Sequence, residues 1–271
     1  MLSPKDLSTL QQFAETTAIK AGRFLLEHQQ KASIVKHKAD IQDIATTADL
    51  ESEKIIIAEI KQHFPQHNIL SEEIGLINHH SDYTWVIDPI DCTKEYFRGL
   101  PTFGVLLSCE HKNHTLAGCV HIPKINETYS ASLGNGTFKD GSKIKVSSQL
   151  KLARAFIFTH IPNTNLNSPK FHQEWQKLGQ VVSKSYRVRS NVFDAQSICW
   201  LASGAIDAFF LLDQVTKVRH WDIAASLIIA QEAGAKISDC RGNPLKFGDY
   251  SSGLVISNGR LHSQLLQILN S

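Results

Sequence analysis

The stretch WVIDPIDCTKEYF, residues 85–97, is the most informative segment of the sequence. An apolar run, Trp85-Val86-Ile87, has the character of a buried strand and leads directly into two carboxylates, Asp88 and Asp91. Open α/β sheets bind their ligands where strands end and helices begin. The pattern therefore predicts a strand that delivers two acidic side chains to a functional site.

Further acids occupy similar positions elsewhere in the chain. Asp49 opens a predicted helix, Glu72 and Glu73 follow the strand-like run 68–71, and Asp222 lies in the first turn of another apolar helix. Carboxylates held together repel one another, which raises their pKa values unless a cation neutralises them. Magnesium prefers oxygen ligands and commonly combines carboxylates with substrate phosphate. If these acids converge, they predict a magnesium site.

The spacing of Asp88 and Asp91 is compatible with two interpretations. Pro89 and Ile90 separate the acids, and a tight turn there would present both carboxylates and the Ile90 carbonyl oxygen to one place. Two metal ions about 3.5–4 Å apart could then clamp the attacking and leaving oxygens of a phosphate ester. Two acids around a proline can equally cap a turn and a helix, and the spacing alone does not decide between these roles.

Composition narrows the class of protein. The chain has 271 residues, of which 42% are hydrophobic and 20% charged, as in a globular protein with a large core. Basic and acidic residues number 28 and 26, so the net charge of +2 gives no reason to expect a nucleic-acid polymer or a membrane as partner. The five cysteines show no CxxC spacing, which argues against a disulfide framework or a zinc site. Because no signal peptide or membrane-spanning run is visible, we expect a cytoplasmic location.

Hydrophobic periodicity and turn signals predict helices alternating with strands along the whole chain. Helices are expected over residues 3–30, 47–64, 169–178, 192–203 and 221–233, with a short one from Thr93 and another closing the chain. Strands are expected over residues 33–37, 68–71, 84–87, 103–110, 115–122, 127–132, 155–159, 205–212, 235–238 and 254–257. This order predicts a mixed α/β fold, with residues 1–271 as one domain softly divided into 1–148 and 149–271 around a shared core.

Four motifs, in this order, resemble those of the inositol monophosphatase family of magnesium-dependent, lithium-sensitive phosphatases. They are KADIQDIATTAD (38–49), LSEE (70–73), DPIDCT (88–93), and WDIAA followed by QEAG (221–225 and 231–234). The resemblance covers about residues 7–268. It implies a layered αβαβα sandwich of the sugar-phosphatase type and a homodimeric enzyme that hydrolyses a small phosphorylated metabolite.

The resemblance also implies roles for individual residues. Two or three Mg²⁺ ions would be held by Glu72, Asp88, the Ile90 carbonyl oxygen, Asp91 and Asp222. The attacking water would be oriented and deprotonated by Asp49 and Thr93, with Glu73 and Lys38 as supporting catalytic residues. The substrate would be bound by Cys92, Thr93, Asp194, Lys217, Arg219 and Asp222.

Cys92 departs from the family pattern, which has glycine at this position. Glycine lets the backbone approach the phosphate closely, and a cysteine with a positive φ there would be strained. We interpret Cys92 as a tolerated small residue that modestly alters affinity and redox sensitivity, which peroxide treatment of the native protein and of Cys92→Ser would test. The alternative is a catalytically weak binding or regulatory protein, against which the intact set of acids argues.

The substrate-binding wall departs from that of the inositol-selective members as well. Where these carry a glutamate, this chain has Leu211, followed by an extended loop whose Lys217 and Arg219 could equally be a solvated face. TKE at 93–95 resembles the 3′(2′),5′-bisphosphate nucleotidases, and GLPTFG at 99–104 resembles the histidinol-phosphate phosphatases. Inositol 1-phosphate is the default substrate of the family. The alternatives are 3′-phosphoadenosine 5′-phosphate, histidinol phosphate and fructose bisphosphate, the substrate of fructose-1,6-bisphosphatase.

Overall fold

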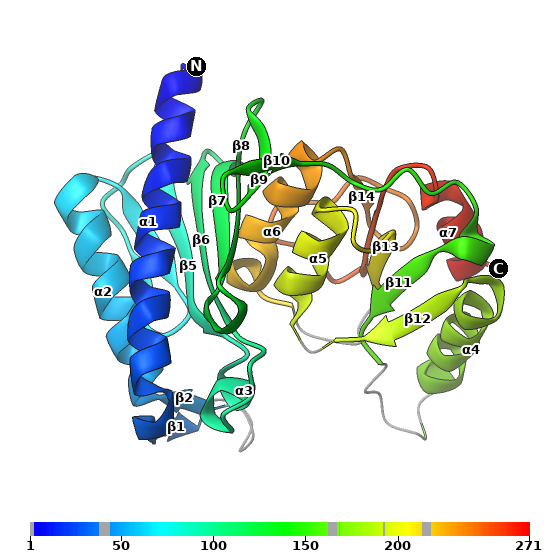
Figure 1. Ribbon diagram of the computed structural model, residues 1–271, viewed down its shortest axis with the longest axis horizontal. Coiled ribbons are helices and arrows are strands. Elements are labelled where there is room, and N and C mark those ends of the chain that lie inside the picture. The colour runs from blue at the N-terminus through cyan, green and yellow to red at the C-terminus, as the bar shows by residue number, and fades with distance from the viewer. Residues whose placement is uncertain (1–2, 38–43, 162–166, 168, 192, 213–217) are drawn as a thin grey trace. The chain divides into compact units, whose positions relative to one another are not determined.

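The computed structural model describes residues 3–37, 44–161, 167, 169–191, 193–212 and 218–271 (Figure 1). The chain forms two compact units. The first comprises Met1–Lys143 and Trp221–Ile229, and the second comprises Ile144–His220 and Ala230–Ser271. A cluster of buried apolar side chains lies in each unit. The expected single domain with its division at 148/149 stays a prediction.

A mixed sheet of eight strands forms the centre of the first unit, in the order β10-β9-β8-β7-β6-β5-β3-β4. β3 and β5 run parallel, whereas β3 and β4, and each successive pair from β5 to β9, run antiparallel. The strands are β3 (Asn68–Ser71), β4 (Gly75–Ile77), β5 (Tyr83–Asp91), β6 (Gly104–His111), β7 (His114–Ile122), β8 (Glu127–Ser132), β9 (Gly136–Lys139) and β10 (Ser142–Ile144).

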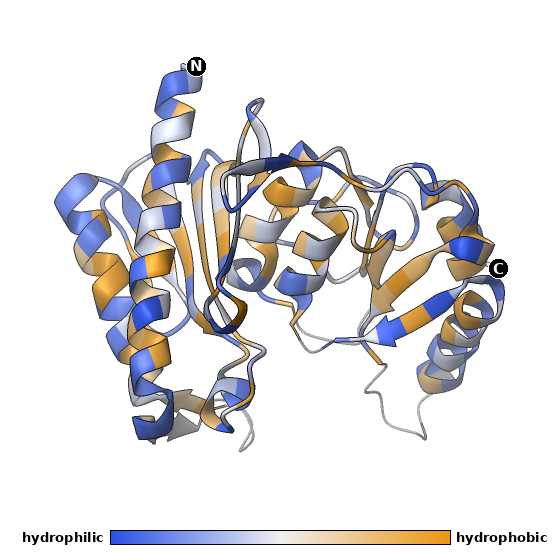
Figure 2. Ribbon diagram, in the orientation of Figure 1, coloured by the Kyte–Doolittle hydropathy of each residue, from blue (hydrophilic) through white to orange (hydrophobic). Residues whose placement is uncertain are grey.

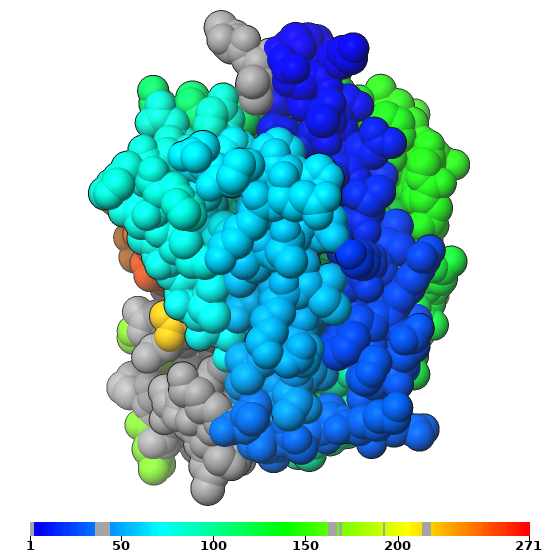
Figure 3. All heavy atoms as spheres, turned by 90° about the vertical axis from the view of Figure 1, so that its left-hand side faces the viewer, coloured from blue at the N-terminus to red at the C-terminus, as the bar shows by residue number. Residues whose placement is uncertain are grey.

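Two helices, α1 (Pro4–His28) and α2 (Thr47–His63), lie side by side on one face of this sheet, which Figure 3 shows from outside. Ser3 and Asp6 form a capping box at the start of α1. The apolar residues of α1 at helical spacing are buried, and Figure 2 colours the strands behind these helices largely as hydrophobic. Helical periodicity in the sequence thus produced the expected packing face.

Residues Trp221–Ile229 of α6 (His220–Glu232) pack against the opposite face of the same sheet. Ala117 and Cys119 of β7 belong to the core under α1, so Gly118 between them faces the other way. A Cβ atom at Gly118 would lie 2.8 Å from the carbonyl oxygen of Ala225. Glycine is therefore required for the close approach of the helix whose first turn carries Asp222.

Short elements complete the first unit. β1 (Ile34–His37) and β2 (Ile44–Thr46) form an antiparallel pair, and α3 (Thr93–Phe97) follows β5. Two 3₁₀ turns, η1 (Gln29–Lys31) and η2 (Pro123–Ile125), follow α1 and β7. Gln29 Nε2 donates to the carbonyl oxygens of Tyr96 and Leu100, which ties the end of α1 to α3.

The second unit contains a five-stranded sheet in the order β12-β11-β13-β15-β14. β11 runs parallel to β12 and β13, whereas β15 runs antiparallel to β13 and β14. Its strands are β11 (Phe156–Thr159), β12 (Arg187–Ser190), β13 (Ala208–Leu211), β14 (Lys236–Ser238) and β15 (Leu254–Ser257). Its helices are η3 (Leu152–Arg154), α4 (Pro169–Lys184), α5 (Asp194–Ala202) and α7 (His262–Leu269).

The predicted mixed α/β class is confirmed, with local differences from the sequence-based expectation. β5 does not end at Ile87 but continues to Asp91, with an irregular register between Asp88 and Asp91. Such an irregularity is where a strand can accommodate a proline such as Pro89. The expected strands did not include the short strands β2, β4, β9, β10 and β12, and α4 extends beyond residue 178. Among the described residues, no helix combines the length and the apolar character that crossing a bilayer requires.

Candidate active site

The predicted metal ligands line one pocket of about 180 Å³ in the first unit. They come from the β3–β4 turn (Glu72), from β5 (Asp88, Ile90 and Asp91) and from the first turn of α6 (Asp222). The remaining lining residues are Ile44, Cys92, Thr93, Lys94 and Glu95. The fold therefore brings together acids that are 150 positions apart in the sequence, from Glu72 to Asp222.

Asp88 is the most deeply buried of these acids, with 2% of its surface exposed. Burial raises the pKa of Asp88 well above its usual value, and the charges of Glu72, Asp91, Asp222 and Asp49 raise it further. A cation in the pocket would oppose this shift, because it would neutralise the mutual repulsion of the carboxylates.

The carboxylates that line the pocket are the kind of ligand that a hard divalent cation prefers, but they do not surround one point closely. Within the described ranges, no three His, Cys, Asp or Glu side chains converge closely enough to hold a metal ion. The acids that line the pocket nevertheless offer only oxygen donors, and Mg²⁺ usually keeps several water ligands. The arrangement thus suits an ion held by a few carboxylates and water.

The irregular end of β5 is held in place by hydrogen bonds to its own residues and to α2. The backbone N–H of Ile90 donates to Asp88 Oδ1 at 3.1 Å. Ser52 Oγ of α2 donates to the carbonyl oxygen of Pro89 at 3.0 Å. These bonds fix the orientation of the Asp88 carboxylate and the path of the backbone to Asp91.

Asp49 joins the start of α2 to the start of α3. Its Oδ2 atom accepts hydrogen bonds from the backbone N–H of Thr46 at 2.8 Å and from Thr46 Oγ1 at 2.5 Å, which makes it part of a capping box. Its Oδ1 atom accepts a hydrogen bond from Thr93 Oγ1 at 2.9 Å. Burial raises the pKa of Asp49 to about 6, although the hydrogen bonds from Thr46 and Thr93 oppose the shift.

Thr93 has a second acceptor within reach. Its Oγ1 atom lies 3.0 Å from the carbonyl oxygen of Ile90, which is itself a predicted metal ligand. Because the hydroxyl carries one proton, it can donate to Asp49 or to Ile90 but not to both at once. Thr93 therefore stands between the carboxylate that could accept its proton and the metal-binding end of β5.

Cys92 adopts the conformation that glycine would favour. Its φ is 69° and its ψ is 49°, in the left-handed region, and it precedes the first residue of α3. The expectation that a side chain here would be strained is confirmed. The Cys92 Sγ atom donates to Asp91 Oδ1 at 3.4 Å, so the thiol lies beside a predicted metal ligand.

Two residues of α2 near the site were missed by the sequence reasoning. Ser52 and Glu53 are 0% and 2% exposed, and they lie one turn after Asp49 on the same helix face. Glu53 Oε1 accepts hydrogen bonds from Ser71 Oγ and from the backbone N–H groups of Glu73 and Ile74. The available signal was their i+3 and i+4 spacing from Asp49, on the face where buried apolar side chains were expected.

Glu73 and Lys38 were predicted as supporting residues. Glu73 lies in the β3–β4 turn directly after Glu72, and its charge contributes to the raised pKa values of Asp49 and Glu53. Burial is the largest cause of the shift at Glu53, as it is at Asp49. Lys38 lies outside the described residues.

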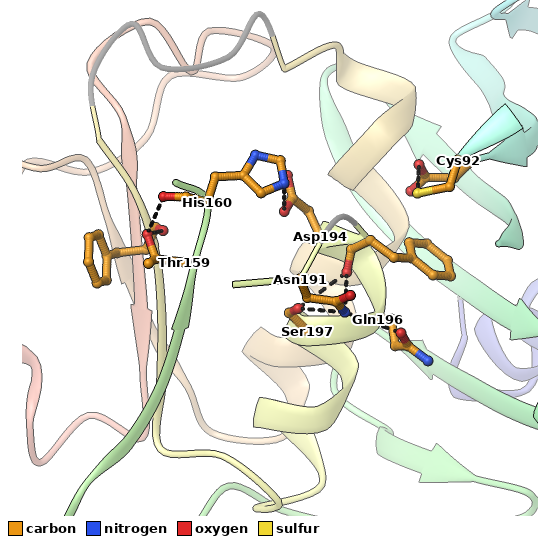
Figure 4. A network of polar contacts seen from close by, with 10 residues as sticks. Cys92, Thr159, His160, Asn191, Asp194, Gln196 and Ser197 are labelled. Atoms are coloured by element: carbon orange, nitrogen blue, oxygen red, sulfur yellow. Dashed lines mark hydrogen bonds and ion pairs between the residues drawn. The ribbon is translucent and has the colours of Figure 1, made fainter. Parts of the chain in front are cut away.

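Of the predicted substrate-binding residues beyond residue 150, Asp194 and Arg219 belong to the second unit, whereas Asp222 belongs to the first. Asp194 begins α5, and its Oδ1 atom lies 3.0 Å from His160 Nε2 (Figure 4). In the same unit, Asn191 Nδ2 donates to Gln196 Oε1 and Ser197 Oγ, both at 3.2 Å. Arg219 is exposed in the segment before α6, and Lys217 lies outside the described residues.

Leu211, which stands where inositol-selective members carry a glutamate, is not accessible to a substrate. It ends β13, pairs with Leu254 of β15 and is 2% exposed. A glutamate at this position would bury a carboxylate among apolar side chains. A Leu211→Glu exchange would therefore report on stability as well as on substrate selectivity.

The chain is similar to known proteins over nearly its whole length. The sequence profile of the inositol monophosphatase family matches residues 6–271. The fructose-1,6-bisphosphatase/inositol-1-monophosphatase of Thermotoga maritima is 32% identical over 253 residues, which cover 93% of this chain and 92% of that protein. The Nus factor SuhB of Vibrio cholerae is 31% identical, with 92% and 91% covered. A solved structure of a Thermotoga maritima IMPase matches with a TM-score of 0.83 at 29% identity and covers 96% of each chain. This chain belongs to the inositol monophosphatase family.

Proposed function

We propose that this protein is a magnesium-dependent phosphatase that hydrolyses a small phosphate monoester, with inositol 1-phosphate as the default substrate. The observation that carries the proposal is the single pocket lined by Glu72, Asp88, Asp91 and Asp222. Its family is one of Mg²⁺-dependent phosphatases. Glu72, Asp88, the Ile90 carbonyl oxygen, Asp91 and Asp222 would hold two or three ions. Bound magnesium neutralises phosphate charge and makes a water molecule acidic enough to attack near neutral pH.

Thr93 and Asp49 supply the path for a proton in this proposal. The Thr93 hydroxyl donates to Asp49 Oδ1 at 2.9 Å, so a proton that reaches Thr93 Oγ1 can be passed on to that carboxylate. Burial raises the pKa of Asp49 to about 6, which leaves it ionised at pH 7 yet basic enough to accept a proton. No covalent intermediate on a serine or cysteine is required.

The phosphate would be held at the start of α3. Cys92 and Thr93 line the pocket, and the backbone N–H groups at a helix start favour an anion. Positioning and charge neutralisation are the main demands of phosphoryl transfer, and this part of the chain contributes both. Asp194, Arg219 and Lys217 are proposed to select the rest of the substrate.

Two observations favour further candidates. The relative from Thermotoga maritima is named as a fructose-1,6-bisphosphatase as well as an inositol-1-monophosphatase, which supports fructose bisphosphate as a second substrate. The relative from Vibrio cholerae is named as a Nus factor, which supports the alternative of a binding or regulatory protein. 3′-Phosphoadenosine 5′-phosphate and histidinol phosphate stay open as substrates, and a homodimer and lithium inhibition are proposed by family membership.

A phosphate-release panel tests the proposal. The full chain is incubated with several dozen phosphorylated metabolites in the presence of Mg²⁺, with EDTA and with Li⁺ as parallel conditions. We expect magnesium-dependent release from a small set that includes inositol 1-phosphate, with inhibition by Li⁺. If no monoester releases phosphate, the catalytic proposal fails and the binding or regulatory interpretation replaces it.

A further inference from the structure

Glu53 is a buried carboxylate that does not line the pocket. It accepts hydrogen bonds from the segment that carries Glu72. It lies one turn after Asp49 on α2 and is 2% exposed. A single atom, Glu53 Oε1, accepts hydrogen bonds from Ser71 Oγ, from the Glu73 N–H at 3.3 Å and from the Ile74 N–H at 3.2 Å. One side-chain oxygen therefore accepts from one donor at the end of β3 and two in the β3–β4 turn.

These three donors flank Glu72 on both sides. Ser71, the last residue of β3, precedes it and is in register with Ile87 of β5, while Glu73 and Ile74 follow it. The backbone N–H of Glu72 itself donates to the carbonyl oxygen of Ile87 at 3.3 Å. Glu72 is thus attached to the residue before Asp88 through its own backbone, and to α2 through its neighbours.

We propose that Glu53 is a positioning residue that sets the affinity of the site for Mg²⁺ by holding Glu72 towards Asp88. This inference rests on the proposed function, because it takes Glu72 as a metal ligand. Residues that orient a ligand through hydrogen bonds typically change metal affinity or activity 10–100-fold when they are removed. Glu53 acts through the length and placement of its oxygen acceptor, not as a ligand.

Two conservative variants separate placement from charge. Glu53→Gln keeps an oxygen acceptor at the same reach and removes the charge. Glu53→Asp keeps the charge and withdraws the acceptor from the turn by one methylene group. If placement matters, the glutamine variant retains magnesium binding and the aspartate variant loses it, whereas a role for the charge predicts the reverse order.

The control is a buried polar residue of the same unit that does not line the pocket. Gln11 of α1 is 8% exposed, donates to Ser130 Oγ at 2.9 Å and accepts from Ser132 Oγ at 2.8 Å. Gln11→Ala removes buried hydrogen bonds away from the β3–β4 turn. It should lower thermal stability while leaving the affinity for Mg²⁺ at the wild-type value.

Calorimetric titration of the full chain with Mg²⁺, without substrate, measures the effect directly. We expect Glu53→Asp to raise the dissociation constant for Mg²⁺ about 10–100-fold. Glu53→Gln should stay within about fivefold of wild type, since hydrogen bonds to a neutral acceptor are roughly half as strong. Phosphatase activity of Glu53→Asp should recover at high Mg²⁺ concentration, which a purely structural defect would not do.

The outcomes distinguish this inference from the proposed function. If wild type binds Mg²⁺ and Glu53→Asp binds it equally well, Glu53 does not position the site, and the proposed function stands. If Glu53→Gln weakens binding as much as Glu53→Asp or more, charge and not placement is responsible, and the inference is wrong. If wild type itself binds no Mg²⁺ at millimolar concentration, both proposals fall.

Discussion

At the scale of single residues, Cys92 adopts a left-handed backbone conformation that glycine would favour. The chain needs a left-handed conformation between β5 and α3, and Cys92 adopts it with φ 69°. For a residue with a side chain this costs about 1–2 kcal/mol relative to glycine. The position is tolerable for cysteine because its side chain is small and half-buried and its thiol donates to Asp91.

Replacing Cys92 separates the backbone requirement from the side chain. Cys92→Gly should change the free energy of unfolding by less than about 1 kcal/mol, since relief of strain is offset by the greater chain entropy of glycine. Its kcat/KM should equal or exceed that of wild type, because a bare backbone lets phosphate approach. Cys92→Val, which is β-branched, should lose about 1–3 kcal/mol. Urea unfolding and phosphate-release kinetics measure both; a loss of activity in the glycine variant would show that the thiol itself takes part.

Asp91→Asn tests the proposed ligand set with almost no change in shape. We expect phosphatase activity to fall to background, because an amide replaces one of the charges that would hold Mg²⁺. Without metal, the fold should be as stable as wild type or more so, since one source of repulsion on Asp88 is removed. Activity and thermal unfolding in EDTA are measured on the same preparation. Full turnover in this variant would contradict the role of Asp91.

At the scale of elements, close packing decides where α6 places Asp222. Gly118 of β7 faces α6 with no room for a side chain, and Thr137 Oγ1 of β9 donates to the carbonyl oxygen of Ile229 at 2.6 Å. The helix is thus held at its middle and towards its end within the first unit. α6 can lie this close to the sheet because Gly118 has no side chain.

Two glycine-to-alanine exchanges should change the stability of the protein in opposite directions. Gly118→Ala forces α6 away from β7, so we expect a loss of about 1–3 kcal/mol and weaker Mg²⁺ binding. Gly179 lies within α4, and no atom lies within 4 Å of the Cβ that alanine would add. Gly179→Ala should therefore stabilise by about 0.4–1 kcal/mol. Urea unfolding and magnesium titration distinguish the two, and equal effects would contradict the packing argument.

His262 links three elements of the second unit through its neutral ring. It begins α7, is 0% exposed, and lies with Nε2 2.9 Å from Ser238 Oγ of β14 and Nδ1 3.0 Å from Ser257 Oγ of β15. Ser238 Oγ donates elsewhere, to the carbonyl oxygen of Asp239, so it accepts from the ring. Burial lowers the pKa of His262 to about 4, and Lys236 adds to the shift.

This shift predicts acid sensitivity with a definite sign. The folded state keeps His262 neutral, whereas the unfolded chain takes up a proton as the pH falls below about 6.5. Stability from this group is therefore complete above pH 6.5 and declines by about 1.4 kcal/mol per pH unit down to about pH 4. His262→Asn should unfold with a shallower pH dependence than wild type when urea unfolding is compared at several pH values between 5 and 7.5. Parallel curves for the two proteins would show that His262 does not titrate in this way.

At the scale of the whole molecule, the two units carry different chemistry. The acids that line the pocket belong to the first unit, whereas His262 and the pair of His160 and Asp194 belong to the second. Each ionised neighbour raises the pKa of Asp88, so a bound cation would relieve repulsion in the first unit. Metal ions should therefore act on the first unit, whereas protons should act on both units, through Asp49 and Asp88 in the first and His262 in the second.

Magnesium should stabilise the protein mainly through the first unit. At a concentration about 100 times its dissociation constant, it should add about 2.7 kcal/mol to the free energy of unfolding, and EDTA should reverse the gain. Hydrogen exchange should slow most in residues 71–93 and 221–229, which contain the proposed ligands. An equal change in residues 150–212 and 234–271, or none at all, would contradict a site confined to the first unit.

Local signals in the sequence determined most of the elements and the identity of the acids. Caps and periodicity act between residues a few positions apart. They account for the capping box at Ser3, the start of α2, and the bounds of β3, β8 and β15. The glycine-like requirement at Cys92, by contrast, was predicted from the resemblance to the inositol monophosphatase family and not from a local pattern. Carboxylates at strand ends and helix starts stand out in any sequence.

Tertiary structure alone decided the features that depend on residues distant in the chain. β5 passes through both acids because its hydrogen bonds to β6 continue to Asp91. Ser52 and Glu53 support the segments that carry the pocket residues because α2 lies against the ends of β3 and β5. Leu211 is buried because β15 pairs with it. Glu72 and Asp222 likewise line one pocket only because α2 packs on one face of the sheet and α6 packs on the other. Such contacts form only when long loops close and side chains interlock, and no local pattern records their partners.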